Sequence, residues 1–182
     1  MVYIVLGRGF EEMEAITPFD LLSRAGIPVC FAGIGGKNIT GSHGITVKTG
    51  IAVEEIKPLE AEMIVLPGGR VGVESILASQ AALDKVQKVW EQGGFAAAIC
   101  AAPVILSSLG ITDGKSVTCY PQEMWESRIR CKHLVKDAPA VRDGKVITAA
   151  SAGCATEFGL ALVAALRGDD LAQKIRKEIV IR

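Results

Sequence analysis

A single cysteine lies at the centre of an uncharged and almost wholly apolar run, "FAAAICAAPVIL" at residues 95–106. The pattern predicts a buried strand that ends at Cys100 and a helix that begins just after it. Pro103 falls in the expected first turn of that helix, where the missing N–H of proline costs nothing. Ala98 and Ala102 are small, as a nucleophile elbow requires, although A-I-C-A-A matches the G-x-S-x-G pattern only loosely.

A cysteine at this position has two explanations. At a helix N-terminus a thiolate faces unpaired N–H groups and the positive end of the dipole, which lowers a cysteine pKa from about 8.5 to about 3.5–7.5. Cysteine is also among the most buried residue types and packs as a small hydrophobe. The local pattern of Cys100 fits both explanations equally well.

Chemistry on a carbonyl group needs more than a thiol, because a proton must be moved and an oxyanion stabilised. The segment "GFEEMEA" supplies Glu11, Glu12 and Glu14 after the first apolar run, and "PGG" at 67–69 ends another. Each has a plainer explanation, since acidic residues favour the first turn of a helix and Pro-Gly-Gly is an ordinary turn. The sequence pattern does not say which carboxylate would face the cysteine.

Strand and helix patterns alternate along the chain and predict an α/β fold with a mostly parallel sheet covered by helices on both faces. We expect buried strands at 2–7, 28–33, 63–69 and 95–99, and a hairpin over 137–151 that turns at Asp143-Gly144. Residues 45–56 are expected to form an exposed hairpin or an extended segment outside the sheet. The expected helices are at 11–26, 73–94, 102–110, 155–168 and 171–181. In such sheets, ligands bind outside the carboxyl ends of the strands. The loops after the first, third and fourth strands carry the candidate residues, so we expect these loops to meet.

Composition excludes several classes of function. The 182 residues suit one domain, spanning 1–182, and the 20 Lys and Arg balance the 20 Asp and Glu, which gives no electrostatic reason to bind nucleic acid or an anionic membrane. The longest apolar run has twelve residues, fewer than the roughly 20 needed to cross a bilayer, and the N-terminus does not resemble a signal peptide. Five cysteines without a CxxC pair predict reduced thiols. We therefore expect a cytoplasmic location.

Other motifs are weak. "GITDGKS" lacks the spacing of a phosphate-binding loop, and no glycine-rich dinucleotide fingerprint follows the first strand. His43 and His133 have no tight metal-ligand spacing with the cysteines, so a zinc site is not expected. Cys30 and Cys154 are interpreted as packing residues. The sequence thus predicts neither a cofactor nor a metal.

Three segments together resemble a known family. "LGRGFEEMEAITPFDLLSRAGI", "IVLPGG" and "AAICAAP", in that order and with "TEFGLALV" near the end, are similar to the ThiJ/PfpI superfamily. The branch is that of the human parkinsonism-associated protein deglycase and its bacterial relatives. The resemblance covers nearly the whole chain and implies a flavodoxin-like three-layer sandwich, related to class I glutamine amidotransferases, that forms a homodimer.

The resemblance also implies roles for individual residues. Cys100 matches the family's nucleophilic, oxidation-sensitive cysteine, and Glu14 matches the protonated glutamate that hydrogen-bonds the sulfur. Gly69 and Ala101 match the positions whose backbone N–H groups form an oxyanion hole. His43 matches a position often held by arginine near the dimer interface.

Two departures from the family pattern affect the expected chemistry. Many relatives carry a T-H-P segment where this chain reads "TCYP", which places Tyr120 where they have a histidine. A phenol does not shuttle protons near neutral pH as imidazole does, although Tyr120 can hydrogen-bond a substrate. Ala101 stands where the intracellular peptidases of the superfamily have a histidine, which argues against peptidase activity.

The resemblance favours a cysteine-dependent, cofactor-independent glyoxalase or protein deglycase that acts on small 2-oxoaldehydes such as methylglyoxal or on glycated protein. The alternative is a redox-sensing stress protein or chaperone that acts through oxidation of Cys100. A hydrolase or thiamine-pathway enzyme is a third and weaker hypothesis.

Overall fold

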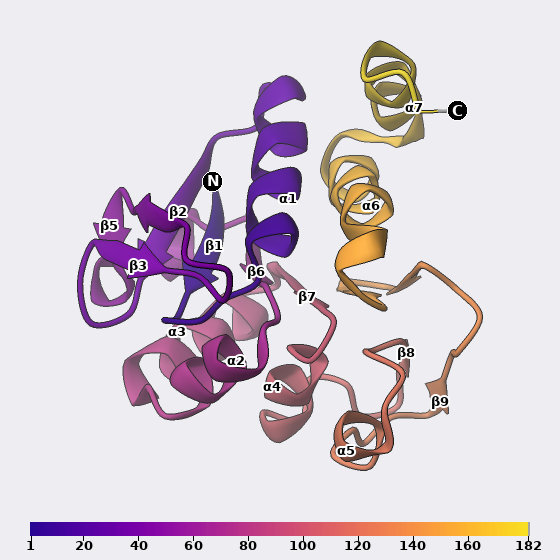
Figure 1. The fold of residues 1–182 in the computed structure, drawn as a ribbon. Helices are drawn as coiled ribbons and strands as arrows, with labels where there is room; N and C mark the ends of the chain where they lie inside the picture. The colour runs from indigo at the N-terminus through magenta and orange to yellow at the C-terminus, as the bar shows by residue number, and fades with distance from the viewer. Residues whose placement is uncertain (182) are drawn as a thin grey trace.

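The computed structural model describes residues 1–181, and a seven-stranded sheet forms its centre (Figure 1). The strand order is β10-β11-β7-β6-β1-β2-β5, and every neighbouring pair is parallel except β10 with β11. The strands are β1 (Val2–Leu6), β2 (Val29–Gly33), β5 (Ile51–Ala52), β6 (Met63–Leu66), β7 (Phe95–Ile99), β10 (Ala140–Asp143) and β11 (Val146–Ala149). The order of the five main parallel strands, 2-1-3-4-5 in chain order, is that of flavodoxin-like folds and confirms the predicted class.

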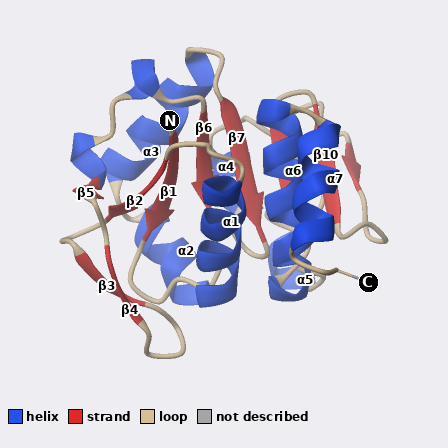
Figure 2. Cartoon of the chain, turned by 90° about the horizontal axis from the view of Figure 1, so that it is seen from above, coloured by secondary structure: helices blue, strands red, loops and turns tan. Residues whose placement is uncertain are grey.

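Helices cover both faces of the sheet and bury two separate apolar clusters (Figure 2). One face carries α1 (Glu12–Arg24), α6 (Ala155–Arg167) and α7 (Asp169–Glu178). The other carries α2 (Arg70–Leu77), α3 (Gln80–Glu91) and α4 (Pro103–Ser108). The central strands β1, β6 and β7 are buried on both sides, which explains their continuous apolar sequences.

Most of the predicted strands and helices are confirmed, but one predicted helix is divided into two. The helix expected over 73–94 is two helices, because α2 ends at Leu77 and the Ser79 side chain begins α3 by accepting a hydrogen bond from the Ala82 N–H at 3.2 Å. The hairpin expected over 45–56 lies earlier in the chain: it pairs β3 (Asn38–Thr40), in a stretch that reads as a glycine-rich loop, with β4 (Thr46–Lys48). β5 follows at the sheet edge.

The region between α4 and β10 contains short elements that the sequence analysis does not predict. They are β8 (Ser116–Val117), α5 (Glu123–Glu126) and β9 (His133–Leu134), and β8 pairs with β9 in parallel. Elements of two to four residues carry too little periodicity to be read from sequence. None of the helices formed by residues 1–181 has both the length and the apolar character that a bilayer-crossing segment needs.

Candidate active site

Cys100 lies in a sharp turn between β7 and α4. Its φ angle is +64°, in the left-handed region that residues other than glycine rarely adopt, and Pro103 is the first residue of α4 as predicted. Backbone hydrogen bonds fix the turn on both sides: the Cys100 N–H donates to Ala149 O at 2.9 Å, and the Tyr120 N–H donates to Cys100 O at 2.8 Å. A strained backbone held by its surroundings is typical of functional positions.

Glu14 reaches the same place from the first turn of α1. Glu11 begins that helix by accepting the Glu14 N–H at 2.8 Å, which turns the Glu14 side chain toward the sheet. The Glu14 side chain is fully buried, and its Oε2 accepts the Gly68 N–H at 2.7 Å. Its Oε1 is buried without a hydrogen-bond partner of good geometry. Such an unsatisfied oxygen is costly and is a sign of a functional group.

The glycines after β6 let the two side chains meet. A Cβ atom on Gly68 would lie 2.6 Å from Glu14 Oε2 and 2.8 Å from the Cys100 Cβ, both closer than atoms can approach. Gly69 has a φ of +84° and precedes α2, and a Cβ there would lie 2.4 Å from Gly9 O. The Pro-Gly-Gly segment is therefore part of the site and is more than a turn.

The backbone N–H groups of Ala101 and Gly69 both lie within hydrogen-bonding reach of the Cys100 sulfur, where they favour a negative charge. These are the two positions that the family resemblance selects for an oxyanion hole. They come from loops after two adjacent strands, β7 and β6. The arrangement can stabilise an anion on sulfur or on an atom bonded to it.

The ionisation of the pair departs from the expectation for a helix N-terminus. Burial raises the pKa of Glu14 to about 7, even though hydrogen bonds from Cys100 and from the Gly68 N–H favour its carboxylate. Burial and the nearby charge of Glu14 raise the pKa of the Cys100 thiol, and the two backbone N–H groups only partly oppose this. The lowering of the thiol pKa that a helix N-terminus favours is outweighed here by burial and by the negative charge of Glu14.

A cavity of about 470 Å³ opens onto this pair. All six residues selected from the sequence line it: Glu14, His43, Gly69, Cys100, Ala101 and Tyr120. Its wall also includes Glu11, which the sequence analysis named among three candidate carboxylates, and residues that it missed, namely Arg70, Gln122, Met124, Trp125, Ser151, Ala152 and Gly153. Two of these had an available signal, since Arg70 directly follows "LPGG" and Ser151 follows the last buried strand at the same sheet edge.

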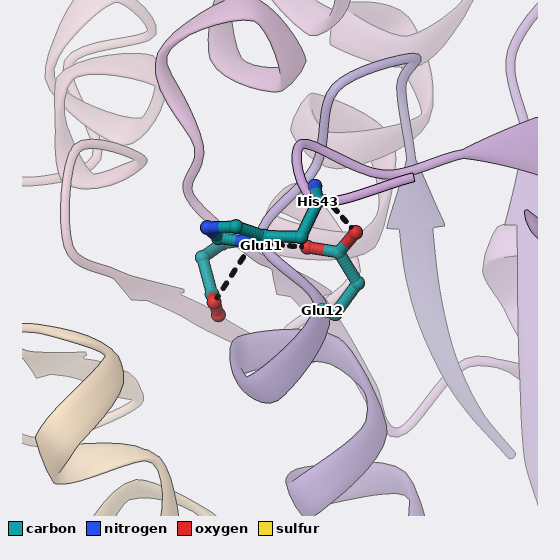
Figure 3. A group of neighbouring side chains, drawn as sticks. All are labelled: Glu11, Glu12 and His43. Atoms are coloured by element: carbon teal, nitrogen blue, oxygen red, sulfur yellow. Dashed lines mark hydrogen bonds and ion pairs between the residues drawn. The ribbon is translucent and has the colours of Figure 1, made fainter. Parts of the chain in front are cut away.

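His43 lies at the tip of the β3–β4 hairpin and pairs with Glu12 (Figure 3). The nearly buried Glu12 carboxylate accepts hydrogen bonds from the His43 N–H at 2.7 Å and the Ser42 hydroxyl at 3.1 Å, and its Oε2 lies 2.9 Å from His43 Nδ1. Burial opposes ionisation of Glu12, but these hydrogen bonds outweigh it and lower its pKa to about 2. The hydrogen bond to Glu12 and the negative charge of the Glu12 carboxylate raise the pKa of His43.

The potential metal ligands in this part of the chain are Glu11, Glu12 and His43, whose ligand atoms lie within 4.8 Å of one another. The sequence spacing did not indicate this group, because the hairpin brings His43 to α1. Both oxygens of Glu12 already accept hydrogen bonds from the 42–45 turn. The group therefore acts as a clamp that holds the hairpin against the start of α1.

Comparison with known proteins places this chain in a family. The sequence matches the DJ-1/PfpI family over residues 1–165. The chain is 34% identical to Protein dj-1beta of Drosophila melanogaster over 179 residues, 98% of this chain and 95% of that protein. It is 38% identical to a deglycase of Pyrococcus abyssi over 120 residues, 66% of this chain and 72% of that protein.

Solved structures agree with these matches. The crystal structure of Drosophila DJ-1beta has a TM-score of 0.92 at 32% identity and covers 100% of this chain and 97% of the other. A structure of oxidised Toxoplasma gondii DJ-1 has a TM-score of 0.91 at 27% identity, with coverage of 98% and 97%. The chain belongs to the DJ-1/PfpI family.

Proposed function

We propose that this protein is a cysteine-dependent, cofactor-independent enzyme of the glyoxalase or deglycase type, acting on 2-oxoaldehydes or on their early adducts with proteins. The observation that carries the proposal is the meeting of Cys100, the buried Glu14 carboxyl group and two backbone N–H groups in one cavity. The Pyrococcus abyssi relative, which is named a deglycase, supports the same class of reaction.

The first step uses Glu14 as a base. A carboxyl group with a pKa of about 7 is partly ionised at neutral pH and can accept the thiol proton as the Cys100 sulfur adds to the aldehyde carbon. The new alkoxide of the hemithioacetal lies near the N–H groups of Gly69 and Ala101, which stabilise it. A separate histidine base is not needed for this step.

The remaining steps move one hydrogen between two carbons. Protonated Glu14 first gives its proton to the alkoxide, and the resulting carboxylate removes the C–H proton of the former aldehyde carbon to give an enediolate. Glu14 then returns this proton to the former ketone carbon, while the hydroxyl proton on the former aldehyde carbon passes to the ketone oxygen. The product is a thioester of Cys100, which water hydrolyses to release a 2-hydroxy acid and the free thiol. The aldehyde carbon is oxidised and the ketone carbon reduced, so no external redox partner is needed.

The size of the cavity bears on the substrate. At about 470 Å³ it falls within the range of sites that bind drug-sized ligands, far larger than a three-carbon aldehyde requires. Trp125, Met124 and Tyr120 on one wall can hold the stem of a glycated side chain. We therefore include early adducts on protein side chains among the proposed substrates.

The test compares methylglyoxal turnover by the wild-type protein with Cys100→Ala and Glu14→Gln. We expect Cys100→Ala to lose turnover completely and Glu14→Gln to lose it by about 100-fold or more, the usual effect of removing a general base. Cys154→Ala is the matched control, because Cys154 is a half-buried thiol outside the lining of the cavity. Full turnover by Cys100→Ala would refute the proposal.

A second candidate function is redox sensing through Cys100. The two N–H groups and a protonated Glu14 can hold the oxygens of a sulfinate, and a Toxoplasma gondii relative has been solved in an oxidised form. Peroxide titration followed by peptide mass spectrometry tests it, with Cys100 expected to gain oxygen first. Earlier oxidation of Cys30, Cys119, Cys131 or Cys154 would exclude this role.

We also propose a homodimer. Met13 and Ile16 of α1 and Ile45 of the β3–β4 hairpin are large apolar side chains that are 54%, 41% and 56% exposed. The Glu12 clamp holds α1 and the hairpin together, so the two elements present one partly apolar surface. Light scattering should give twice the chain mass for the wild-type protein and a smaller mass for Ile45→Lys; a monomeric wild-type protein would contradict the proposal.

A further inference from the structure

Arg70 is placed between two cavities at the start of α2. It lines the cavity of Cys100 and also a neighbouring cavity of about 350 Å³, whose wall includes Arg8, Thr40 and Ser42. Neither Arg70 nor Arg8 forms a side-chain ion pair within residues 1–181, whereas most other arginines do: Arg24, Arg128, Arg130, Arg167 and Arg176. The cavity of Cys100 is therefore lined by an arginine that forms no ion pair with any carboxylate of residues 1–181.

The backbone around Arg70 adds further donors. Arg70 and Val71 are the first two residues of α2, and their N–H groups have no acceptor in the described chain. The next N–H, of Gly72, donates to Gly9 O at 3.1 Å. The Arg70 N–H, the positive end of the eight-residue helix and the Arg70 side chain thus favour an anion where the two cavities adjoin, whereas Val71 lines only the neighbouring cavity.

Other charged groups face the cavity as well. Glu11 lines it, but its Oε2 accepts the Glu14 N–H and its Oε1 lies 3.9 Å from His43 Nδ1, so its charge is directed toward α1 and the hairpin. At the inner end, Glu14 Oε1 is buried and has no hydrogen-bond partner of good geometry within residues 1–181. The cavity therefore brings the reacting groups Cys100 and Glu14 and the positively charged Arg70 into one lining.

We propose that Arg70 and the N-terminus of α2 bind an anionic group of the substrate, so that the preferred substrate is a 2-oxoaldehyde with a carboxylate or phosphate at its far end. This inference rests on the proposed function and specifies its substrate class. The chemistry is unchanged: a molecule R–CO–CHO and one water give R–CHOH–COOH. The anionic group in R takes no part in bond making and serves only to orient the carbonyl groups toward Cys100 and Glu14.

The first experiment measures kcat/KM for three substrates: methylglyoxal, 4,5-dioxopentanoate with a carboxylate, and 3-phosphooxy-2-oxopropanal with a phosphate. We expect the wild-type protein to prefer an anionic substrate, and whichever anion is preferred identifies the group bound. In Arg70→Gln the ratio of anionic to neutral kcat/KM should fall by about 10- to 100-fold, the effect of losing one charge-assisted hydrogen bond. Arg70→Lys should restore part of the ratio.

Arg8→Gln is the matched control, because it removes the same charge from the same face without changing the wall of the Cys100 cavity. It should keep the wild-type ratio. If the ratio of anionic to neutral kcat/KM fell equally in Arg8→Gln, the preference would come from long-range attraction between the protein and the anionic substrate, and the inference would be overturned. An unchanged ratio in Arg70→Gln would overturn it as well. Failure of all three substrates with the wild-type protein would instead refute the proposed function.

A second experiment does not depend on turnover. Iodoacetate and iodoacetamide alkylate the same thiol but differ in charge, so the ratio of their rates at Cys100 reports on nearby positive charge. We expect Arg70→Gln to lower this ratio by about tenfold relative to wild type and Arg8→Gln to leave it unchanged. Equal ratios in the three proteins would overturn the inference whatever the turnover assays show.

Discussion

Replacing Glu14 by glutamine should stabilise the protein, and the gain should appear only above acidic pH. Glutamine has nearly the same shape, and its side-chain oxygen can still accept the Gly68 N–H that bonds Glu14 at 2.7 Å. What the substitution removes is a carboxyl group that is fully buried and whose pKa is raised from 4.5 to about 7.

The sign follows from linkage. Below pH 4.5 the Glu14 carboxyl group is protonated in both the folded and the unfolded chain, so it does not oppose folding. As the pH rises from 4.5 to about 7, the unfolded chain ionises at Glu14 while the folded chain does not, and the free energy of unfolding falls. Since one pKa unit corresponds to about 1.4 kcal/mol, the wild-type protein loses about 3 kcal/mol over this interval. At pH 8 the Glu14→Gln protein should be more stable than wild type by up to about 3 kcal/mol, and at pH 4 the difference should be small.

Urea denaturation at pH 4, 6 and 8 under reducing conditions measures these differences. Glu12→Gln is the matched control, because Glu12 lies two residues away on α1 and its pKa is lowered to about 2 by hydrogen bonds that outweigh the opposing effect of burial. Its stabilising contribution is present above pH 4.5 and is lost as the pH falls toward 2. Glu12→Gln should therefore destabilise the protein at pH 8.

The two variants are thus expected to change stability in opposite directions at pH 8. If Glu14→Gln were less stable than wild type by the same amount at pH 4 and pH 8, ionisation of Glu14 would not oppose folding. The raised pKa that the proposed mechanism uses would then be wrong. Glu14→Gln should combine higher stability with lower turnover, as expected for a residue kept for function.

Three further predictions concern the backbone of the site and the fold. Gly68→Ala should lower turnover by about 100-fold, because the new Cβ would displace Glu14 and Cys100, and steady-state kinetics on the folded variant will show it. Cys100→Gly should be more stable than Cys100→Ala by about 1 kcal/mol in urea denaturation, since only glycine adopts a φ of +64° without strain; the reverse order would contradict a strained turn. Ser79→Ala should cost about 1 kcal/mol by thermal unfolding through loss of the α3 cap, with no effect on turnover.

Much of the fold was predictable from periodicity and turn residues. The strands around "VYIVL", "MIVL" and "FAAAI" are apolar without alternation because β1, β6 and β7 are buried on both faces, and such runs are typical of parallel sheets. The division at Ser79 was missed, although the buried positions change phase there, from Val73 and Ile76 in α2 to Ala82, Val86 and Val89 in α3. The short elements of the 116–134 region were missed for lack of any period, and α5 among them supplies Met124 and Trp125 to the cavity.

The candidate site was predictable only in part. Its nucleophile position followed from a local rule, because small residues and Pro103 around Cys100 predict a sharp strand-to-helix turn. The choice of Glu14 over Glu11 and Glu12 came from the family resemblance. The three-dimensional structure supplies the physical reason for that choice. Glu11 begins α1 and Glu12 clamps the hairpin, while only Glu14 is directed at Gly68 and the sulfur.

Local sequence patterns account for the order of the main strands and helices, the turn at Cys100 and the presence of carboxylates and glycines at neighbouring strand ends. These depend on local patterns of apolar, small and turn-forming residues. How the side chains ionise and which of them share a cavity depend on the folded structure. Folding raises the pKa of both Glu14 and Cys100, brings His43 to Glu12 and places Arg70, which has no ion pair within residues 1–181, in the cavity of the thiol. Burial and charge separation are properties of residues far apart in the chain, so no local pattern contains them.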